Sequence, residues 1–312
     1  MTSIVFMGTP AFSSPILRML VEEGYDVVAV VTQPDRPVGR KKVLTPPPVK
    51  VEALEHGIEV LQPEKLKGSA EWLRLQELQP DLIVTAAFGQ LLPEEVLALP
   101  RFGAINVHAS LLPKYRGGAP IHQAIIDGED TTGVTIMYMV KKLDAGDIIS
   151  QIELPIEDTD TTGSLFDKLS SSGTQLLKET LPSILAGTNS RTAQQESEVT
   201  FARNISREQE KLDWSKSARD LFNQIRGLNP WPGAYTTFNG TTVKIWSSQL
   251  VEGKETALPG EIIETNERFV VQAGDGKALE LVELQPSGKK KLTVDEFLRG
   301  VGQQYTLGER FE

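Results

Sequence analysis

The sequence predicts an α/β domain followed by a C-terminal β-barrel. Apolar, strand-like segments alternate with helical ones over residues 1–186, which is typical of a mostly parallel, Rossmann-like sheet with helical crossovers. Over residues 205–312, short strand-like segments recur around turn signals, which favours a small barrel. Residues 187–204 are polar, rich in Thr, Ser and Gln, and are interpreted as a linker. The chain of 312 residues therefore predicts two domains of different class.

The first domain begins with a strand over residues 3–8. Thr9 is predicted to cap the following helix, with Pro10 at its first position and Gly24 at its end. A long helix over residues 162–186, interrupted by Gly173, ends the domain. Between these elements, apolar segments predict five more strands, at residues 26–32, 81–86, 103–108, 132–140 and 147–156.

The second domain is predicted from its turns. A helix over residues 217–226 precedes two pairs that are typical of hairpin turns, Asn239-Gly240 and Asp275-Gly276. Each pair lies between short apolar segments, so the strands on either side of it are expected to be antiparallel. Successive hairpins of this kind favour a closed, barrel-like sheet.

Composition excludes several classes of site. The chain has no Cys, which rules out disulfides, thiol catalysis and thiolate metal sites and agrees with a reducing, cytoplasmic location. Its 3 His form no His-Glu-x-x-His pattern and no calcium-loop spacing occurs, so no metal is expected. Neither Gly-x-Gly-x-x-Gly nor a P-loop follows the first strand, so no nicotinamide cofactor is expected. No apolar run is long enough to span a bilayer, and no membrane partner is expected.

Asn106 and His108 are the strongest candidates for catalysis. The period of two in a strand puts both side chains on one face, at the carboxyl end where parallel sheets bind their ligands. An amide can donate a hydrogen bond to a developing oxyanion, while an imidazole can transfer a proton. Asp144, in the segment Leu-Asp-Ala-Gly-Asp, is the carboxylate expected to orient the imidazole. This set suits the transfer of an acyl-type group.

Basic residues gather in one loop of an acidic chain. The net charge of −10 argues against a nucleic-acid partner unless the cations are clustered. The Pro-rich residues 34–48 form such a cluster, and residues 289–291 form a second one. The cations of the Pro-rich loop are Arg36, Arg40, Lys41 and Lys42. An acidic protein with basic patches would bind RNA locally, and the guanidinium of Arg40 is the best single candidate for contact.

Several separated motifs resemble one enzyme family. The strand end Asn106-Val107-His108, the loop Ser110-Leu111-Leu112-Pro113 and the later Asp144 resemble the active site of the formyltransferases that use 10-formyltetrahydrofolate. Three more segments are similar to the branch of that family that acts on the methionine carried by initiator tRNA. They are Gly8-Thr9-Pro10, Gln33-Pro34-Asp35-Arg36-Pro37 and Asn229-Pro230-Trp231-Pro232.

The resemblance implies an activity and its partners. The expected reaction is formyl transfer from 10-formyltetrahydrofolate to the α-amine of methionyl initiator tRNA, by a monomer that needs no metal or nicotinamide. Asn106, His108 and Asp144 would be catalytic, the basic loop would contact tRNA, and the second domain would be OB-like. The resemblance also implies a folate pocket, formed by Phe88, Gly89, Leu91, Leu92, Pro93, Ser110, Leu111, Leu112 and Pro113.

Other acceptors and one other class of protein are alternatives. The same chemistry could serve glycinamide ribonucleotide, a nucleotide-linked amino sugar, or water in hydrolysis of the formyl-folate. The basic loop and the C-terminal domain argue against all three. A non-catalytic RNA-binding protein is a further alternative, and the intact catalytic set argues against it. His122 is interpreted as a residue on a helix surface, with substrate contact as the alternative.

Overall fold

The chain folds into two compact units in the computed structural model, which describes residues 2–39 and 41–312. The first unit contains Met1–Pro120, Thr132–Leu154 and Phe166–Arg203, and the second contains Ile121–Thr131, Pro155–Leu165 and Asn204–Glu312. Two short segments that the sequence analysis placed in the first domain thus group with the second unit. The residues interpreted as a linker group with the first unit, except for Asn204.

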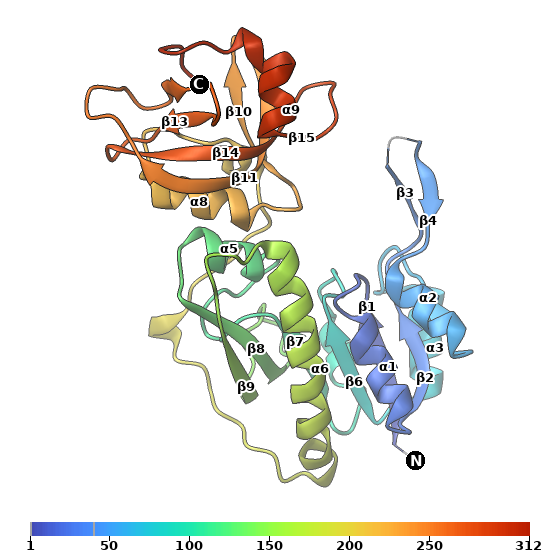
Figure 1. Cartoon of the computed structure of the whole chain (residues 1–312). Helices are drawn as coiled ribbons and strands as arrows, with labels where there is room; N and C mark the ends of the chain where they lie inside the picture. Colours follow the sequence, from blue (N-terminus) through green and yellow to red (C-terminus); the bar gives the residue numbers. More distant parts are fainter. Residues whose placement is uncertain (1, 40) are drawn as a thin grey trace. The chain divides into compact units, whose positions relative to one another are not determined.

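A seven-stranded sheet forms the centre of the first unit, in the order β5-β2-β1-β6-β7-β8-β9 (Figure 1). The first five strands in this order pair in parallel, and β8 pairs antiparallel to β7, which confirms the predicted mostly parallel sheet. Its strands are β1 Ser3–Gly8, β2 Asp26–Val31, β5 Val60–Leu61, β6 Leu82–Ala86, β7 Ala104–His108, β8 Thr131–Tyr138 and β9 Ile148–Pro155. Strands β1 and β6 are buried along nearly their whole length, because they are mostly apolar and covered on both faces.

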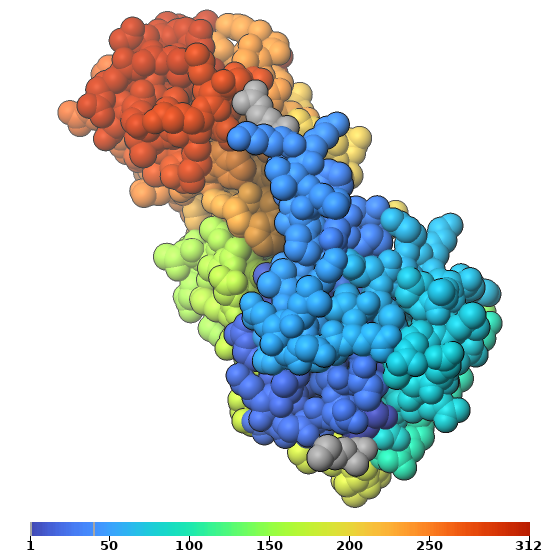
Figure 2. Space-filling view, turned by 90° about the vertical axis from the view of Figure 1, so that its right-hand side faces the viewer, coloured from blue at the N-terminus to red at the C-terminus, as the bar shows by residue number. Residues whose placement is uncertain are grey.

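Helices occupy most of the crossovers in this part of the chain. They are α1 Ser14–Glu22, α2 Pro48–Glu55, α3 Ala70–Leu78, α4 Glu94–Leu97, α5 Pro120–Ile126 and α6 Thr162–Ala186. None of the helices among the described residues is both long enough and apolar enough to cross a membrane. A separate two-stranded hairpin, β3 Arg36–Val38 and β4 Val43–Thr45, follows β2 and projects from the unit (Figures 1 and 2).

The first helix begins later than the sequence predicts. It starts at Ser14, with a proline in its first turn, whereas Thr9 was expected to cap it. The Thr9 hydroxyl instead donates to the carbonyl of Phe88, and the Ser13 hydroxyl donates to the carbonyl of Ala86. These two bonds hold residues 10–13 as a turn against the end of β6, so tertiary contacts override the local capping pattern.

The long helix α6 is continuous, although Gly173 was expected to interrupt it. A Cβ at this position would lie 3.0 Å from Val107 Cγ1 and 3.2 Å from Val134 Cγ1. These valines belong to β7 and β8, so the glycine lets the helix backbone lie close to the sheet. Close packing compensates for the weak helix propensity of glycine here.

The ion pair between Arg18 on α1 and Glu52 on α2 is expected to make stability depend on pH. Its hydrogen bonds lower the pKa of the Glu52 carboxyl, against the opposing effect of burial, and His56 lowers it further. A carboxyl whose pKa is lower in the folded chain stabilises the fold above its unfolded pKa of about 4.3 and loses this contribution as the pH falls. Because Arg18 is half exposed, we expect Arg18→Met to cost only about 1 kcal/mol at pH 7.

Urea unfolding at pH 7 and at pH 3 measures this effect. The difference between Arg18→Met and the wild type should become smaller from pH 7 to pH 3, because the ion-paired Glu52 carboxylate loses its stabilising contribution as the pH falls below its unfolded pKa. An equal difference at both pH values would mean that Arg18 stabilises the helix pair by packing alone.

The second unit is built on an antiparallel sheet, in the order β10-β11-β14-β13-β12, with β15 paired to β14. Its elements are α7 Arg207–Glu210, α8 Ala218–Gly227, β10 Ala234–Phe238, β11 Thr241–Glu252, β12 Ile262–Glu264, β13 Val270–Gln272, β14 Lys277–Pro286, β15 Leu292–Thr293 and α9 Val294–Arg299. Both predicted hairpin turns are present, and Asn239, Gly240 and Gly276 adopt the positive φ that such turns require.

The C-terminal residues join the two edges of this sheet. Glu312 exchanges two backbone hydrogen bonds with Thr237 on β10, and Arg310 pairs with Glu261 next to β12. Because each edge strand gains a partner, the sheet closes as the predicted barrel does. Aromatic rings fill the interior, where Phe269 packs edge-on against Phe297 at a centroid distance of 5.2 Å.

Candidate active site

The candidate site begins at the end of β7, where Asn106 and His108 share one face of the strand. The hydroxyl of Thr85, on the neighbouring strand β6, donates to Asn106 Oδ1 at 2.8 Å. This bond holds the oxygen of the Asn106 carboxamide in place. Its Nδ2 donates to none of the described residues, so it can serve a substrate oxygen.

His108 is held in a defined orientation. Its side chain is only 6% exposed, and its Nε2 lies 3.0 Å from the carbonyl oxygen of Tyr115. A carbonyl can only accept, so Nε2 carries a proton and Nδ1 has the free lone pair of the neutral ring. Nδ1 lies 3.8 Å from Asp144 Oδ2, which is too far for a hydrogen bond but close enough for an ion pair with a protonated ring.

Asp144 lies in the loop between β8 and β9 that the sequence analysis singled out. Its φ is 46°, in the left-handed region that Asp and Asn adopt more readily than other side chains. The backbone N–H of Gly117 donates to Asp144 Oδ2 at 2.9 Å. Because the carboxylate is largely buried and held by this bond, it stays close to His108.

The loop after β7 is fixed by the side chains of Thr135 and Gln151. Thr135 Oγ1 donates to the carbonyl of Ser110 and accepts from the backbone N–H of Leu112. Gln151 Nε2 donates to the carbonyl of Leu112. Of the predicted folate contacts in this loop, Ser110 and Leu112 are buried, whereas Leu111 and Pro113 are partly exposed.

The other predicted folate segment, residues 88–93, follows β6. The carbonyl of Phe88 accepts from Thr9 Oγ1 at 3.0 Å and from Gln33 Nε2 at 3.2 Å. The two motifs at Thr9 and Gln33 are therefore brought together at this carbonyl. Leu91 is 73% exposed, whereas Phe88 and Leu92 are buried, and Gly89 and Pro93 are at least partly exposed.

The predicted basic loop is a β-hairpin, β3–β4, with two exposed lysines at its tip. Lys41 and Lys42 form no ion pair with the described residues, while Arg36 pairs with Glu64 at 2.6 Å. Arg40 lies outside the described residues. The second basic cluster, residues 289–291, differs from the hairpin tip, because Lys290 and Lys291 form ion pairs with acidic neighbours.

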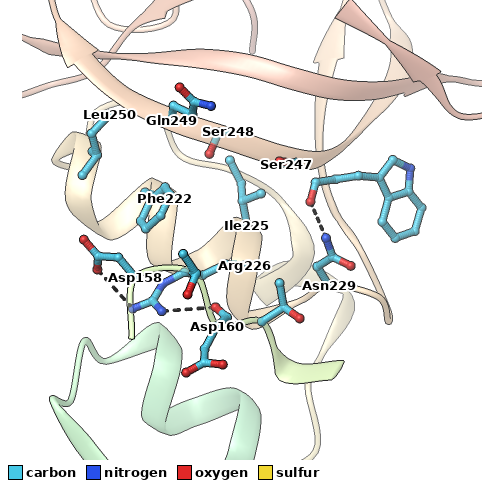
Figure 3. A pocket seen from close by; sticks show the side chains of 13 residues that line it. Asp158, Asp160, Phe222, Ile225, Arg226, Asn229, Ser247, Ser248, Gln249 and Leu250 are labelled. Atoms are coloured by element: carbon cyan, nitrogen blue, oxygen red, sulfur yellow. Dashed lines mark hydrogen bonds and ion pairs between the residues drawn. The ribbon is translucent and has the colours of Figure 1, made fainter. Parts of the chain in front are cut away.

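A hollow of about 450 Å³ lies in the second unit, and the catalytic candidates take no part in it (Figure 3). Its wall includes Arg226 on α8, whose guanidinium donates to the carbonyls of Glu157 and Asp160. Burial lowers the pKa of this guanidinium. The hydrogen bonds fasten residues 155–165 to α8, which explains why this segment groups with the second unit.

His122 is less exposed than a residue on a helix surface. Its ring lies edge-on to Trp231, with centroids 5.9 Å apart, and burial lowers its pKa. Its Nε2 is buried without a hydrogen-bond partner among the described residues. The described residues also contain no cluster of His, Asp and Glu that could bind a metal ion.

Sequence reasoning missed two residues that hold the candidate site together: Thr85 and Gln194. Thr85 is the only polar residue in β6, and this isolated position in an apolar strand is a signal that could have identified it. The side chain of Gln194 donates to the carbonyl of Asp144, 50 residues earlier. No local pattern indicates such a contact.

The chain matches two family models along most of its length. The model described as formyl transferase matches residues 1–181, and the model of the formyl transferase C-terminal domain matches residues 204–302. Methionyl-tRNA formyltransferase of Lysinibacillus sphaericus (strain C3-41) is 61% identical over 100% of both chains. The enzyme of the same name from Bacillus subtilis (strain 168) is 60% identical over 96% of this chain and 95% of its own.

Solved structures share the fold at lower identity. An N-formyltransferase from Helicobacter canadensis, in complex with folinic acid and dTDP-3-aminofucose, has a TM-score of 0.70 and 21% identity over 90% of this chain and 99% of its own. The sugar 3N-formyltransferase WlaRD has a TM-score of 0.69 and 20% identity over 93% of this chain and 99% of its own.

Proposed function

The chain belongs to the family of methionyl-tRNA formyltransferases, and we propose that Asn106, His108 and Asp144 form the centre at which it transfers a formyl group. The donor is 10-formyltetrahydrofolate, and the acceptor is the α-amino group of methionine on initiator tRNA. The product is N-formylmethionyl-tRNA, which is used in translation initiation.

One observation carries the assignment of the centre. An amide donor, an imidazole nitrogen with a free lone pair and a largely buried carboxylate meet at the end of β7, with 3.8 Å between His108 Nδ1 and Asp144 Oδ2. Acyl-type transfer to an amine needs a donor for negative charge on oxygen and an acceptor for the ammonium proton. The three side chains supply both.

The residues after β6 fit the folate. The peptide groups of residues 89–92 make no backbone hydrogen bond with the described residues, so their donors and acceptors are available to the edge of a pterin ring. The exposed Leu91 side chain offers an apolar surface beside them. We therefore propose that Phe88, Gly89, Leu91, Leu92 and Pro93 hold the pterin and that the loop Ser110–Pro113 lies along the rest of the folate. The bound cosubstrate supplies the electrophilic formyl carbon.

Each catalytic side chain has a distinct role. Asn106 Nδ2 donates to the formyl oxygen as that oxygen gains negative charge. His108 Nδ1 accepts a proton from the attacking amine, directly or through a water, and Nε2 stays bonded to the carbonyl of Tyr115. Asp144 stabilises the imidazolium that results. The protonated Nδ1 can then give this proton to the folate nitrogen as the bond from that nitrogen to the formyl carbon breaks and tetrahydrofolate leaves.

The β3–β4 hairpin is the proposed contact for tRNA. Its tip carries Lys41 and Lys42, exposed and without ion pairs to the described residues, and Arg36 lies at its base. Arg40 belongs to the same proposal, although it lies outside the described residues. Unpaired cations on a projecting hairpin suit the RNA backbone, which an acidic surface would otherwise repel.

Replacing Lys41 and Lys42 together with Ala is expected to raise the KM for charged tRNA and leave kcat unchanged. The salt dependence should weaken as well, with the slope of log KM against log salt falling by about two, because each lost phosphate contact removes about one from the slope. The double variant Arg74→Ala, Lys178→Ala is the matched control, since it removes the same charge from α3 and α6, where these side chains are 42% and 45% exposed. Equal slopes in the two variants would contradict a contact at the hairpin.

A competition assay tests the function itself. Formyl transfer from 10-formyltetrahydrofolate is measured with charged initiator tRNA, charged elongator methionyl-tRNA, glycinamide ribonucleotide and water as acceptors. We expect strong preference for the charged initiator. Formyl loss to water or to a small amine, with none to tRNA, would contradict the proposed acceptor.

We also propose that the enzyme works as a monomer in the cytoplasm, where its charged tRNA substrate enters translation. The catalytic candidates all come from one unit of a single chain, so no second copy is needed to complete the centre. Sedimentation at assay concentration measures the oligomeric state, and a dimer that loses activity on dilution would contradict the proposal.

A further inference from the structure

Residues 190–202, which we call the strap, lie along two loops of the candidate active site. Thr192 exchanges two backbone hydrogen bonds with Ile148, directly after the loop of Asp144. Further along, the N–H of Arg116 donates to the carbonyl of Thr200 at 2.9 Å, and the N–H of Ala202 donates to the carbonyl of Arg116 at 2.8 Å. The strap is therefore bonded by its main chain to both loops.

Gln194 connects the two loops with its side chain. Its Nε2 donates to the carbonyls of Asp144 and Gly146, both at 2.8 Å. Its Oε1 accepts from Arg116 Nε at 3.0 Å and from Arg116 Nη2 at 2.8 Å. These four hydrogen bonds use the full capacity of the amide, two donors and two lone pairs.

Arg116 lies between the two residues that hold the catalytic side chains. The carbonyl of Tyr115, before it, binds His108 Nε2, and the N–H of Gly117, after it, binds Asp144 Oδ2. The Arg116 side chain is fully buried, so its guanidinium has a fixed position from which to bind Gln194. A displacement of Arg116 or of the Asp144 loop would change the distance between Asp144 and His108.

We propose that Gln194 is a positioning residue that keeps Asp144 opposite His108 by tying the carbonyls of Asp144 and Gly146 to the guanidinium of Arg116. This inference rests on the proposed function of the catalytic centre. Gln194 itself touches no reacting atom. It affects kcat by holding the Asp144 carboxylate in position.

Two replacements of Gln194 separate the role of its amide nitrogen, which donates, from that of its amide oxygen, which accepts. Gln194→Met keeps the length of the side chain and removes all four hydrogen bonds. Gln194→Glu keeps the acceptor for Arg116 but places carboxylate oxygens against two carbonyls that need a donor. We expect both variants to lose about 10- to 100-fold in kcat, since a displacement of about 1 Å can cost 10²-fold, with KM for both substrates within about two-fold of the wild type.

Gln195→Met is the matched control, because Gln195 is exposed and its side chain bonds to none of the described residues. It should keep the wild-type kcat. Wild-type kcat in Gln194→Glu would overturn the proposal, because the bonds to the two carbonyls would then not matter. A rise in KM for the folate or the tRNA, with kcat unchanged, would also overturn it, since it would indicate a role in binding.

A double-mutant cycle distinguishes this inference from the proposed function. If Gln194 acts through Asp144, then Gln194→Met should lower kcat in the wild-type background and have little further effect in the Asp144→Asn background. Full, independent losses in both backgrounds would overturn the positioning role. Wild-type kcat in Asp144→Asn would overturn the proposed centre, whereas an impaired Asp144→Asn beside an unimpaired Gln194→Met would overturn only the role of Gln194.

Discussion

His108→Ala is expected to lower kcat by about 10²- to 10⁴-fold, because the amine then has no positioned acceptor for its proton. Asn106→Ala should lower kcat by about 10²- to 10³-fold, the usual effect of removing one oxyanion donor. Asp144 is the third residue of the proposed centre. Asp144→Asn tests its negative charge, since Asn keeps the side-chain shape and tolerates the φ of 46° at this position. The measurement is single-turnover formyl transfer to charged initiator tRNA.

The effects of replacing His108 and Asp144 should not add. These two residues act as one unit, so the variant that combines His108→Ala with Asp144→Asn should be about as slow as His108→Ala alone. His56→Ala is the matched control, because this His lies at the end of α2 and pairs with Glu52 alone among the described residues. Thermal unfolding should show that the Asn106 and His108 variants stay folded at the assay temperature, although loss of the buried His108 ring should lower the midpoint of its variant. Wild-type rates in all three single variants would contradict the proposed centre.

The sequence predicts the central part of this site because its pattern is local. Asn106 and His108 are two residues apart on a strand, and a period of two is enough to put them on one face. The turns at Asn239-Gly240 and Asp275-Gly276 were predictable for the same reason, since the positive φ of Asn239, Gly240 and Gly276 favours Gly and Asn at these positions.

Contacts between distant segments could not be predicted in this way. Thr9 has the local pattern of a helix cap, yet its hydroxyl donates to Phe88, 79 residues away. The strap resembles a linker because it is polar and has little regular structure, but Gln194 and Glu196 use that polarity to bind the buried guanidinium of Arg116. In both places, a polar side chain has partners that only the fold brings close.

The closure of the barrel has the same explanation. The last four residues look like an ordinary chain end in the sequence, but they pair with β10 and with the residue before β12. Residues 155–165 group with the second unit because Arg226 binds the carbonyls of Glu157 and Asp160. Neither pairing has a periodic or compositional signal. Domain boundaries predicted from the sequence therefore divide the chain into consecutive segments and miss these contacts.

Gly146→Ala is expected to lower kcat by at least about 10²-fold, although it adds only one methyl group. The new Cβ would overlap the backbone carbonyl of Tyr138 on β8, so the loop of Asp144 would have to move away from the sheet. The carbonyl of Gly146 is also an acceptor for Gln194, and the same movement would break that bond. Overpacking of this kind should cost about 1–3 kcal/mol of stability as well.

Gly187→Ala is the matched control for this change. An added Cβ there meets no atom within 4 Å, while its φ of +68° gives a comparable loss of stability, about 1–2 kcal/mol. Its kcat should therefore stay at the wild-type value, and the comparison separates a displaced loop from a less stable protein. If Gly146→Ala also keeps the wild-type kcat, the loop can move without effect on the transfer, and a fixed distance between Asp144 and His108 is not what the reaction requires.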